Sequence, residues 1–418
     1  MSDNLISRQV AIRALNRLWI TDQTLETVLD RDPAFIGLSA PDRAFVRLSV
    51  LTVLRRRGQI DAVLKRLMRR PLGPKQQTVH TILRLAVGQH LFLQTPMYAC
   101  VNTAVALTRQ NHFEGLTGLV NGVLRAFGRL EMPLEGLENP VLNLPDWIRM
   151  AWEQAYGVET TAGCARACME QPPLDITVRD EAELWACKWQ GTVLPTGGVR
   201  VSVSSPLDLA GFETGPCLVQ NGAASVPARL FTNVQDKCVA DLCAAPGGKT
   251  VQLAWRGARV RAYDISAKRL ERLHENLERL GLQGQVQTNV ADVMTWTPEI
   301  LFDAVLLDAP CSATGTIARH PEILYHRTQA DVVRLAAVQR EMLNKAVRMT
   351  KPGGEIVFST CSLQPEEGDE VVRALGDRVQ VIRPADRRWN PYLTPFGSLR
   401  FLPTMGFDGF YACLLRRV

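Results

Sequence analysis

From about residue 236 onward, the chain alternates between short apolar runs and longer amphipathic stretches. The stretch SAKRLERLHENLERLGL at 266–282 carries apolar residues at helical spacing, whereas the apolar runs have the length and composition of strands. Alternating strands and helices predict a mostly parallel α/β sheet with helices on both faces. We expect the strands at 237–243, 259–264, 286–292, 302–310, 354–362 and 410–417.

The segment Asp241-Leu-Cys-Ala-Ala-Pro-Gly-Gly-Lys-Thr250 follows the first of these strands and precedes a helix. Gly247 and Gly248 allow a sharp turn and a close approach to a ligand, and the start of the helix can receive a carboxylate. S-adenosylmethionine carries such a carboxylate. The segment lacks both the Gly-x4-Gly-Lys spacing of nucleoside triphosphate loops and the G-x-G-x-x-G spacing of dinucleotide loops. The alternative is a tight turn that binds nothing.

Acidic residues end the next two strands. Asp264 suits hydrogen bonds to the ribose hydroxyls of a nucleoside cofactor, and Asp292 lies where an adenine amino group can be recognised. Each is ambiguous alone, because an acid in this place also caps helices.

Two cysteines follow the fourth and fifth strands, in Asp308-Ala-Pro-Cys311 and in Thr360-Cys361-Ser362. Thiols at the ends of two strands of one sheet can face one pocket. The alternative is that both are small buried hydrophobic residues. A third pair, Cys164 and Cys168, is four residues apart on a predicted helix with no second Cys or His pair near it, so no metal site is expected there.

The N-terminal part has a different pattern, with apolar residues at helical spacing and two helices expected within 98–127. Short strand-like runs then alternate with turns between 172 and 225, and we expect strands at 174–179, 199–204 and 217–220. We therefore expect a multidomain chain: an all-α domain, a small α+β connector and an α/β domain. The expected ranges are 1–139, 140–225 and 226–418.

Charge is unevenly distributed. Residues 1–140 carry 18 Lys and Arg against 11 Asp and Glu, and the rest of the chain carries 30 against 31. A basic surface attracts a polyanion such as nucleic acid, although a charged helix face can also simply solvate a domain. The excess is densest between Arg43 and Arg84. It includes Arg55, Arg56, Arg57, Lys65, Arg66, Arg69, Arg70 and Lys75.

Composition narrows the cellular setting. No apolar run is long enough to span a membrane, and the first residues lack the apolar core of a secretory signal. Ten scattered cysteines in 418 residues suit reduced thiols. The expected location is the cytoplasm, without membrane association.

DLCAAPGGKT, Asp264, Asp292, DAPCSATG and STCS together resemble the RNA (cytosine-5)-methyltransferase family, and VNGVLR in the helical part resembles the NusB-type RNA-binding domain. The resemblance implies a Rossmann-like class I methyltransferase domain, S-adenosylmethionine as cofactor, Cys361 as nucleophile and Cys311 as the group that assists product release. It implies that Asp308 serves both base and cofactor. The implied cofactor contacts are Cys243, Ala244, Ala245, Pro246, Gly247, Gly248, Lys249, Asp264, Asp292 and Asp308.

The resemblance also implies a partner, 16S ribosomal RNA, free or in an early assembly particle, and no DNA. The chain departs from the family at two places. It has Val219-Gln220-Asn221 where Val-Gln-Asp is usual, which removes a carboxylate. It has Ala318-Arg319-His320-Pro321-Glu322 followed by Leu324-Tyr325, where Arg-Arg-His-Pro-Asp followed by Lys-Trp is usual. These departures concern details of RNA contact and leave the cofactor and thiol motifs intact.

The chemistry explains why such motifs are needed. Carbon 5 of cytosine is a poor nucleophile until a thiolate adds at carbon 6. Amino-group methyltransferases usually carry an Asp/Asn-Pro-Pro-aromatic turn, whereas Pro310 here precedes Cys311, and the Glu-Asn-Val motif of the DNA cytosine-5 enzymes is absent. Two alternatives remain: a non-catalytic RNA-binding factor of the NusB kind, or an enzyme acting on another RNA such as tRNA.

Overall fold

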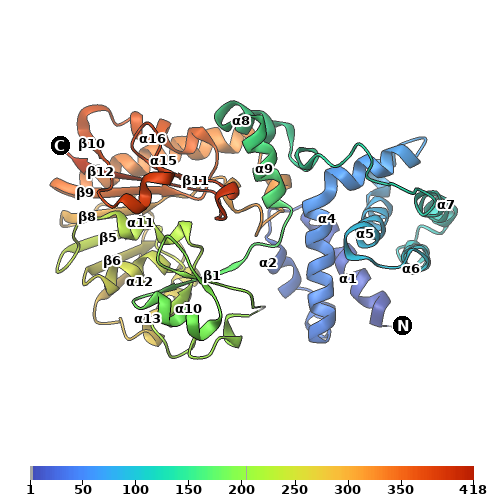
Figure 1. Ribbon diagram of the computed structural model, residues 1–418, viewed down its shortest axis with the longest axis horizontal. Coiled ribbons are helices and arrows are strands. Elements are labelled where there is room, and N and C mark those ends of the chain that lie inside the picture. The colour runs from blue at the N-terminus through green and yellow to red at the C-terminus, as the bar shows by residue number, and fades with distance from the viewer. Residues whose placement is uncertain (1–2, 204) are drawn as a thin grey trace. The chain divides into compact units, whose positions relative to one another are not determined.

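The computed structural model describes residues 3–203 and 205–418. They form two compact units (Figure 1). The first contains the chain through Gln171 together with the inserted segment Ile317–Arg327, and the second contains Pro172–Thr316 and Thr328–Val418. The chain therefore leaves the second unit after Thr316 and returns to it at Thr328.

The first unit is helical, as its apolar spacing predicts. Three helices, α1 (Asp3–Leu18), α4 (Ala40–Leu67) and α5 (Gln77–Leu93), pack against one another. The side chain of Ser39 accepts a hydrogen bond from the backbone N–H of Asp42 and so caps α4. The short helices α2 (Leu25–Asp30) and α3 (Pro33–Ile36) adjoin α1, and α6 (Met97–Gln110) and α7 (Thr117–Phe127) confirm the two helices expected within 98–127.

The first unit extends beyond residue 139. The 3-10 turn η3 (Pro140–Asn143) packs against α4, where a Cβ atom on Gly58 would lie 1.8 Å from the carbonyl oxygen of Leu142. The backbone N–H of Gln59 donates to the Asn143 side chain at 3.1 Å. The helices α8 (Asp146–Tyr156) and α9 (Val158–Cys168) follow. The expected connector 140–225 is thus divided between the two compact units, because its helices pack with the preceding chain.

A small antiparallel sheet opens the second unit. Its order is β2 (Thr192–Val193), β3 (Val199–Val201), β1 (Leu174–Val178) and β4 (Cys217–Val219), with α10 (Ala182–Trp189) packed on it. The sequence predicts β1, β3 and β4, although the last residue of the expected run at 199–204, Ser204, lies outside the described residues.

The main sheet has the order β10-β12-β9-β8-β5-β6-β7, with β11 (Leu399–Phe401) paired to β12. Neighbours from β9 to β7 run parallel, and β12 runs antiparallel to β9. The mostly parallel sheet is therefore confirmed. Its strands are β5 (Cys238–Leu242), β6 (Arg259–Asp264), β7 (Val286–Val290), β8 (Phe302–Asp308), β9 (Thr350–Thr360), β10 (Val379–Ile382) and β12 (Phe410–Arg417).

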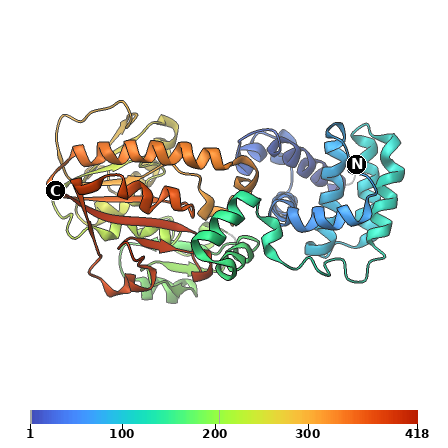
Figure 2. The same ribbon diagram turned by 90° about the horizontal axis from the view of Figure 1, so that it is seen from above.

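Helices cover both faces of this sheet. Alternate residues of a strand point to opposite faces: Leu306 packs in a cluster with α11 (Pro227–Leu230), α12 (Gly248–Trp255) and α13 (Ala267–Arg279), and Leu307 packs in a cluster with α15 (Gln329–Met349) and α16 (Asp369–Arg373). Figure 2 shows the long helix α15, in orange, running along the sheet. Such a sheet brings the carboxyl ends of β5 to β9 to one edge.

In the part of the chain that the structure describes, no helix is long and apolar enough to cross a membrane. Nor do three or more His, Cys, Asp or Glu residues gather there as a metal site. Cys164 and Cys168 are both buried in α9.

Candidate active site

The segment after β5 forms a tight loop at the edge of the sheet. Cys243 and Gly247 both have positive φ angles, 61° and 106°. A Cβ atom on Gly247 would lie 2.2 Å from Cδ1 of Leu273 on α13, so the loop needs glycine for both its conformation and its packing. Gly248 begins α12, and the peptide N–H groups of its first turn have no partner within the helix. The loop therefore has the shape expected for receiving a carboxylate.

Asp264 fixes this loop from the end of β6. Its two carboxylate oxygens accept hydrogen bonds from the backbone N–H groups of Ala245, at 3.1 Å, and Ser266, at 3.0 Å. The Arg269 guanidinium lies 3.4 Å away, and Asp264 is only 1% exposed. Asp292 follows β7 and accepts from the N–H of Met294 at 2.8 Å. Asp264 thus contacts the loop, and Asp292 follows the neighbouring strand.

Asp308 joins the loop to the end of β8. The ammonium group of Lys249 lies 2.7 Å from Asp308 Oδ2, and the Ser359 hydroxyl donates to Oδ1 at 2.8 Å. Lys249 is mostly buried and Asp308 is partly exposed. The structure therefore brings the predicted cofactor loop and the predicted base-contacting carboxylate into direct contact.

Two further groups at β5 are set by burial. Burial raises the pKa of Asp241 to about 7, and the Thr250 hydroxyl donates to this carboxylate at 2.5 Å. Burial, together with the charges of Asp308, Asp264 and Asp241, raises the pKa of Cys243 to about 12. Cys243 therefore stays a thiol, which suits a contact residue rather than a nucleophile.

The other two cysteines of the predicted site face each other. The sulfur atoms of Cys311 and Cys361 are 3.4 Å apart, and both residues are partly exposed. The hydrogen bond with Cys361, followed by burial, raises the pKa of Cys311 well above its ordinary value. Cys311 therefore stays a thiol, and its S–H group can donate a hydrogen bond to the sulfur of Cys361.

The loops that carry the two thiols are held by a buried polar cluster. Glu367 is fully buried and accepts hydrogen bonds from the N–H of Ser312 at 2.8 Å, from its hydroxyl and from the side chain of Gln339 at 3.0 Å. The Ser362 hydroxyl lies 3.1 Å from that of Ser312 and 3.2 Å from that of Thr314. No local pattern in the sequence marks Glu367 or Gln339 as part of this cluster.

A backbone contact also joins these loops. The N–H of Gly315 donates to the carbonyl of Cys361 at 3.0 Å, and the N–H of Gly409 donates to the carbonyl of Gly315 at 2.8 Å. A Cβ atom on Gly315 would lie 1.9 Å from the Gly409 oxygen. Glycine is therefore needed here to let the two loops meet.

The departure at Asn221 is partly offset by a neighbour. Asp175 on β1 is buried, and its carboxylate accepts from Arg200, from the N–H of Gly222 at 3.1 Å and from the Asn221 amide at 3.4 Å. A carboxylate therefore remains next to the position where the family usually carries one.

Unpartnered buried acceptors lie near the loop from Cys243 to Lys249. Among the described residues, Oε1 of Gln220 and Oδ1 of Asp241 are buried without a hydrogen-bond partner. Gln220 lies against the start of α12, where a Cβ atom on Gly248 would be 3.0 Å from its amide nitrogen. The acids, the open helix start and these acceptors match the ribose, carboxylate and amine of S-adenosylmethionine.

The expected basic surface of the first unit is smaller than the charge count indicates. Arg55 and Arg84 are buried: Arg55 donates to the carbonyl of Ala318 at 2.7 Å, and Arg84 forms a bidentate pair with Asp61. These arginines serve the interior of the unit and cannot meet RNA. Five exposed cations remain near the end of α4, which we call the basic end: Lys65, Arg66, Arg69, Arg70 and Lys75.

Comparisons with known families assign both parts of the chain. Residues 228–416 match the family described as 16S rRNA methyltransferase RsmB/F, and residues 5–129 match the NusB family. The first match spans the main sheet with both thiols, and the second spans α1 to α7.

Whole-chain comparisons agree. Proteins named "Ribosomal RNA small subunit methyltransferase B" from Cronobacter sakazakii and Klebsiella pneumoniae are each 34% identical to this chain, with full coverage of both. Among solved structures, the fold resembles that of PH0851, with a TM-score of 0.76, 24% identity, and coverage of 100% of this chain and 99% of that one. A methyltransferase homolog protein from Pyrococcus horikoshii gives a TM-score of 0.57 at 27% identity, covering 68% of this chain and 99% of that one. The chain belongs to the family of ribosomal RNA small subunit methyltransferase B.

Proposed function

We propose that this chain transfers the methyl group of S-adenosylmethionine to carbon 5 of a cytosine in 16S rRNA through a covalent bond between Cys361 and carbon 6. The observation that carries this proposal is the thiol pair: Cys311 and Cys361 meet at 3.4 Å beside Asp308, whose partner Lys249 lies in the cofactor loop. A site of this kind suits covalent catalysis next to a bound methyl donor.

S-adenosylmethionine supplies an electrophilic methyl group on sulfur. Asp264 and Asp292 are the residues we assign to its ribose and adenine, and the loop from Cys243 to Lys249 is assigned to its methionine end. Asp308 is assigned to both cofactor and base. These assignments rest on the position of each residue at the carboxyl end of its strand.

Bond formation begins at Cys361. Its sulfur adds to carbon 6 as a thiolate, and the ring electrons move toward carbon 5, which then takes the methyl group. Asp308 is placed to stabilise the ring by hydrogen bonding while its electrons shift. Cys311, whose pKa is raised, can act as the hydrogen-bond donor to the sulfur of Cys361 and so stabilise its thiolate before attack.

Release requires that the proton on carbon 5 leave and that the bond to Cys361 break, returning its electron pair to sulfur. The main cause of the raised pKa of Cys311 is its hydrogen bond with Cys361, and this bond is lost once Cys361 is bonded to carbon 6. Cys311 can then give its own proton to water and take the proton from carbon 5. We therefore assign attack to Cys361 and release to Cys311.

The RNA partner is supported by the family and by the exposed basic end of the helical unit. Relatives 34% identical over the whole chain are named for the RNA of the small ribosomal subunit. We therefore propose 16S rRNA, free or in an early assembly particle, as the substrate. The target cytosine must be unpaired or flipped out to reach the thiols.

The test is methyl transfer from S-adenosylmethionine labelled in its methyl group to 16S rRNA, to tRNA and to DNA. Nuclease digestion and chromatography should place the label in 5-methylcytidine from 16S rRNA. Label in tRNA alone would move the proposal to another RNA. No transfer to any nucleic acid, combined with RNA binding, would leave a non-catalytic RNA-binding factor.

A further inference from the structure

The inserted segment Ile317–Arg327 begins six residues after Cys311 and belongs to the helical unit. Thr328 then caps α15 in the second unit. Ile317 is fully buried, and Ile323 and Leu324 are at most 9% exposed. Burial on this scale is unusual for a connecting loop, which ordinarily lies on the surface. The helical unit therefore encloses the chain that continues from the Cys311 loop.

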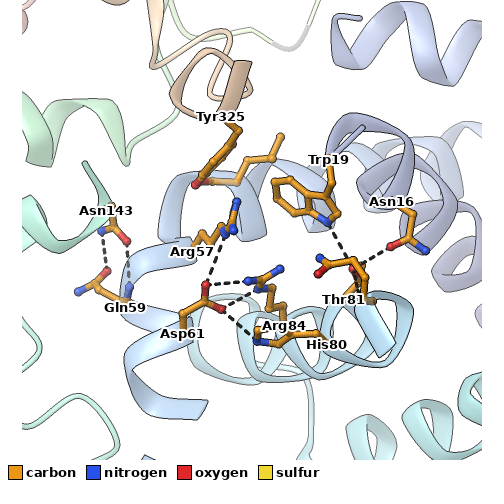
Figure 3. A network of polar contacts seen from close by, with 12 residues as sticks. Asn16, Trp19, Arg57, Gln59, Asp61, His80, Thr81, Arg84, Asn143 and Tyr325 are labelled. Carbon is orange, nitrogen blue, oxygen red and sulfur yellow. Dashed lines mark hydrogen bonds and ion pairs between the residues drawn. The ribbon is translucent and has the colours of Figure 1, made fainter. Parts of the chain in front are cut away.

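Tyr325 is the main anchor of this segment (Figure 3). Its hydroxyl donates to the carbonyl of Leu54 on α4 at 2.5 Å, and its ring meets Trp19 edge to face at 5.2 Å. The Arg57 guanidinium lies 4.6 Å from the centre of the Trp19 ring and 4.7 Å from that of Tyr325. Burial raises the pKa of Tyr325, so its hydroxyl remains a donor. We call Trp19, Arg57 and Tyr325 the clasp.

Backbone and charged contacts fasten the rest of the segment. Arg55 donates to the carbonyl of Ala318 at 2.7 Å, and the N–H of Leu25 donates to Glu322 at 3.2 Å. The ring of His326 lies 2.8 Å from the carbonyl oxygen of Leu18. Contacts from α1, α2 and α4 thus hold both ends and the middle of the segment.

The clasp is itself oriented by a partly buried network. Asp61 lies 3.4 Å from Arg57 and receives two hydrogen bonds from Arg84, at 2.6 Å and 2.8 Å (Figure 3). His80 lies 3.6 Å from the same carboxylate, and burial followed by the charge of Arg84 lowers its pKa to about 4. His80 is therefore neutral near pH 7 and leaves Asp61 to the two arginines.

The loop that carries Cys311 needs such support. Ala313 has a φ angle of 59°, in the left-handed region, which a non-glycine residue occupies only where its surroundings hold it. In the second unit, Glu367 holds Ser312 on one side of Ala313. On the other side, the backbone N–H of Gly315 donates to the carbonyl of Cys361, and the chain then runs into the segment that the clasp holds.

We propose that Tyr325 and Arg57 are positioning residues for the release step: they hold the segment that follows Cys311, so that the placement of Cys311 depends on the folded helical unit. They act through the chain rather than on the substrate. This proposal rests on the release role proposed for Cys311.

The test compares full-length variants on 16S rRNA. Tyr325→Ala removes the ring, and Tyr325→Phe removes only the hydrogen bond to Leu54. Tyr98→Ala is the matched control, because Tyr98 is 73% exposed on α6 of the same unit. Cys311→Ala marks a complete block of release. Each variant is measured for S-adenosylmethionine affinity, kcat, KM for RNA and the protein–RNA adduct on denaturing gels.

Tyr325→Ala should bind S-adenosylmethionine and RNA like wild type while its kcat falls, roughly 10-fold or more, because a small misplacement of a reacting group costs rate rather than binding. Adduct should accumulate, to less than the level in Cys311→Ala. The kcat and the adduct level of Tyr325→Phe should lie between those of Tyr325→Ala and wild type. Tyr98→Ala should match wild type in both.

Two results would overturn the positioning role alone. In the first, Cys311→Ala accumulates adduct while both Tyr325 variants turn over like wild type. In the second, both Tyr325 variants lose cofactor affinity and adduct together, which is the mark of a purely structural role. Absence of adduct in Cys311→Ala would instead refute the covalent release step itself, and the positioning role with it.

Discussion

At the scale of single residues, surroundings separate three cysteines that the sequence presents alike. Cys243 is a thiol held protonated by burial and by three nearby carboxylates. Cys311 is held protonated first by its hydrogen bond with Cys361. We propose Cys361 as the sulfur that attacks carbon 6. Sequence position alone cannot give this order, because all three follow sheet strands.

Asp264 should determine cofactor affinity. Its carboxylate already orders the loop through Ala245 and lies where the ribose is expected, so Asp264→Ala removes a charge-assisted hydrogen bond and should weaken S-adenosylmethionine binding by about 1–3 kcal/mol. Asp264→Asn is the control, because it keeps an acceptor for the Ala245 N–H. Calorimetric titration measures both variants. A wild-type dissociation constant for Asp264→Ala would remove Asp264 from the cofactor site.

At the scale of elements, the sequence predicts those helices and strands that a local pattern of apolar residues marks. The six expected strands of the main sheet are confirmed, as are the two helices within 98–127 and the strands β1, β3 and β4. Strands β10 and β11 were not predicted, because they are short and their pairing with β12 is a tertiary contact. Glu367 likewise has no local signal, since its partners Ser312 and Gln339 lie far away in the sequence.

Burial of Asp241 should appear in the pH dependence of stability. The pKa of Asp241 in the folded state, about 7, lies above the unfolded value of 3.8. The contribution of Asp241 to stability is therefore fully present below pH 3.8 and is lost as pH rises toward 7. Asp241→Asn does not titrate. Between pH 5 and pH 8, the free energy of unfolding of the variant should rise relative to that of wild type by roughly 2–3 kcal/mol, at about 1.4 kcal/mol per pKa unit. Urea unfolding at both pH values tests this, and parallel pH curves would contradict it.

At the scale of the whole molecule, the main surprise is the path of the chain. The segment Ile317–Arg327 lies within the helical unit although it follows a catalytic motif, and helices as far as Gln171 join the same unit. Composition indicates a linker near residue 140, but the packing of η3 on α4 involves ordinary-looking residues such as Gly58 and Leu142. Removing residues 1–139 would therefore expose Ile323, Leu324 and Tyr325 rather than free an independent domain.

The exposed charge of the helical unit also differs from the sequence-based expectation, because several of its arginines do not face solvent. We expect the exposed basic end to bind RNA phosphates. The double variant Arg69→Gln with Arg70→Gln should reduce the slope of log affinity against log salt by about 0.7–0.9 for each phosphate that is no longer neutralised. The matched control neutralises Lys268 and Arg272, two exposed cations on α13. Equal slopes for the double variant and wild type would exclude the basic end from RNA binding.

The central claim is the division of labour between the two thiols, and the protein–RNA adduct tests it most directly. Each variant is incubated with 16S rRNA and S-adenosylmethionine and run on a denaturing gel. Cys361→Ala should give neither methylation nor adduct, because no bond to carbon 6 forms. Cys311→Ala should accumulate an adduct that survives denaturation, because the bond forms and is not released. An adduct from Cys361→Ala with none from Cys311→Ala would contradict the account and exchange the two roles.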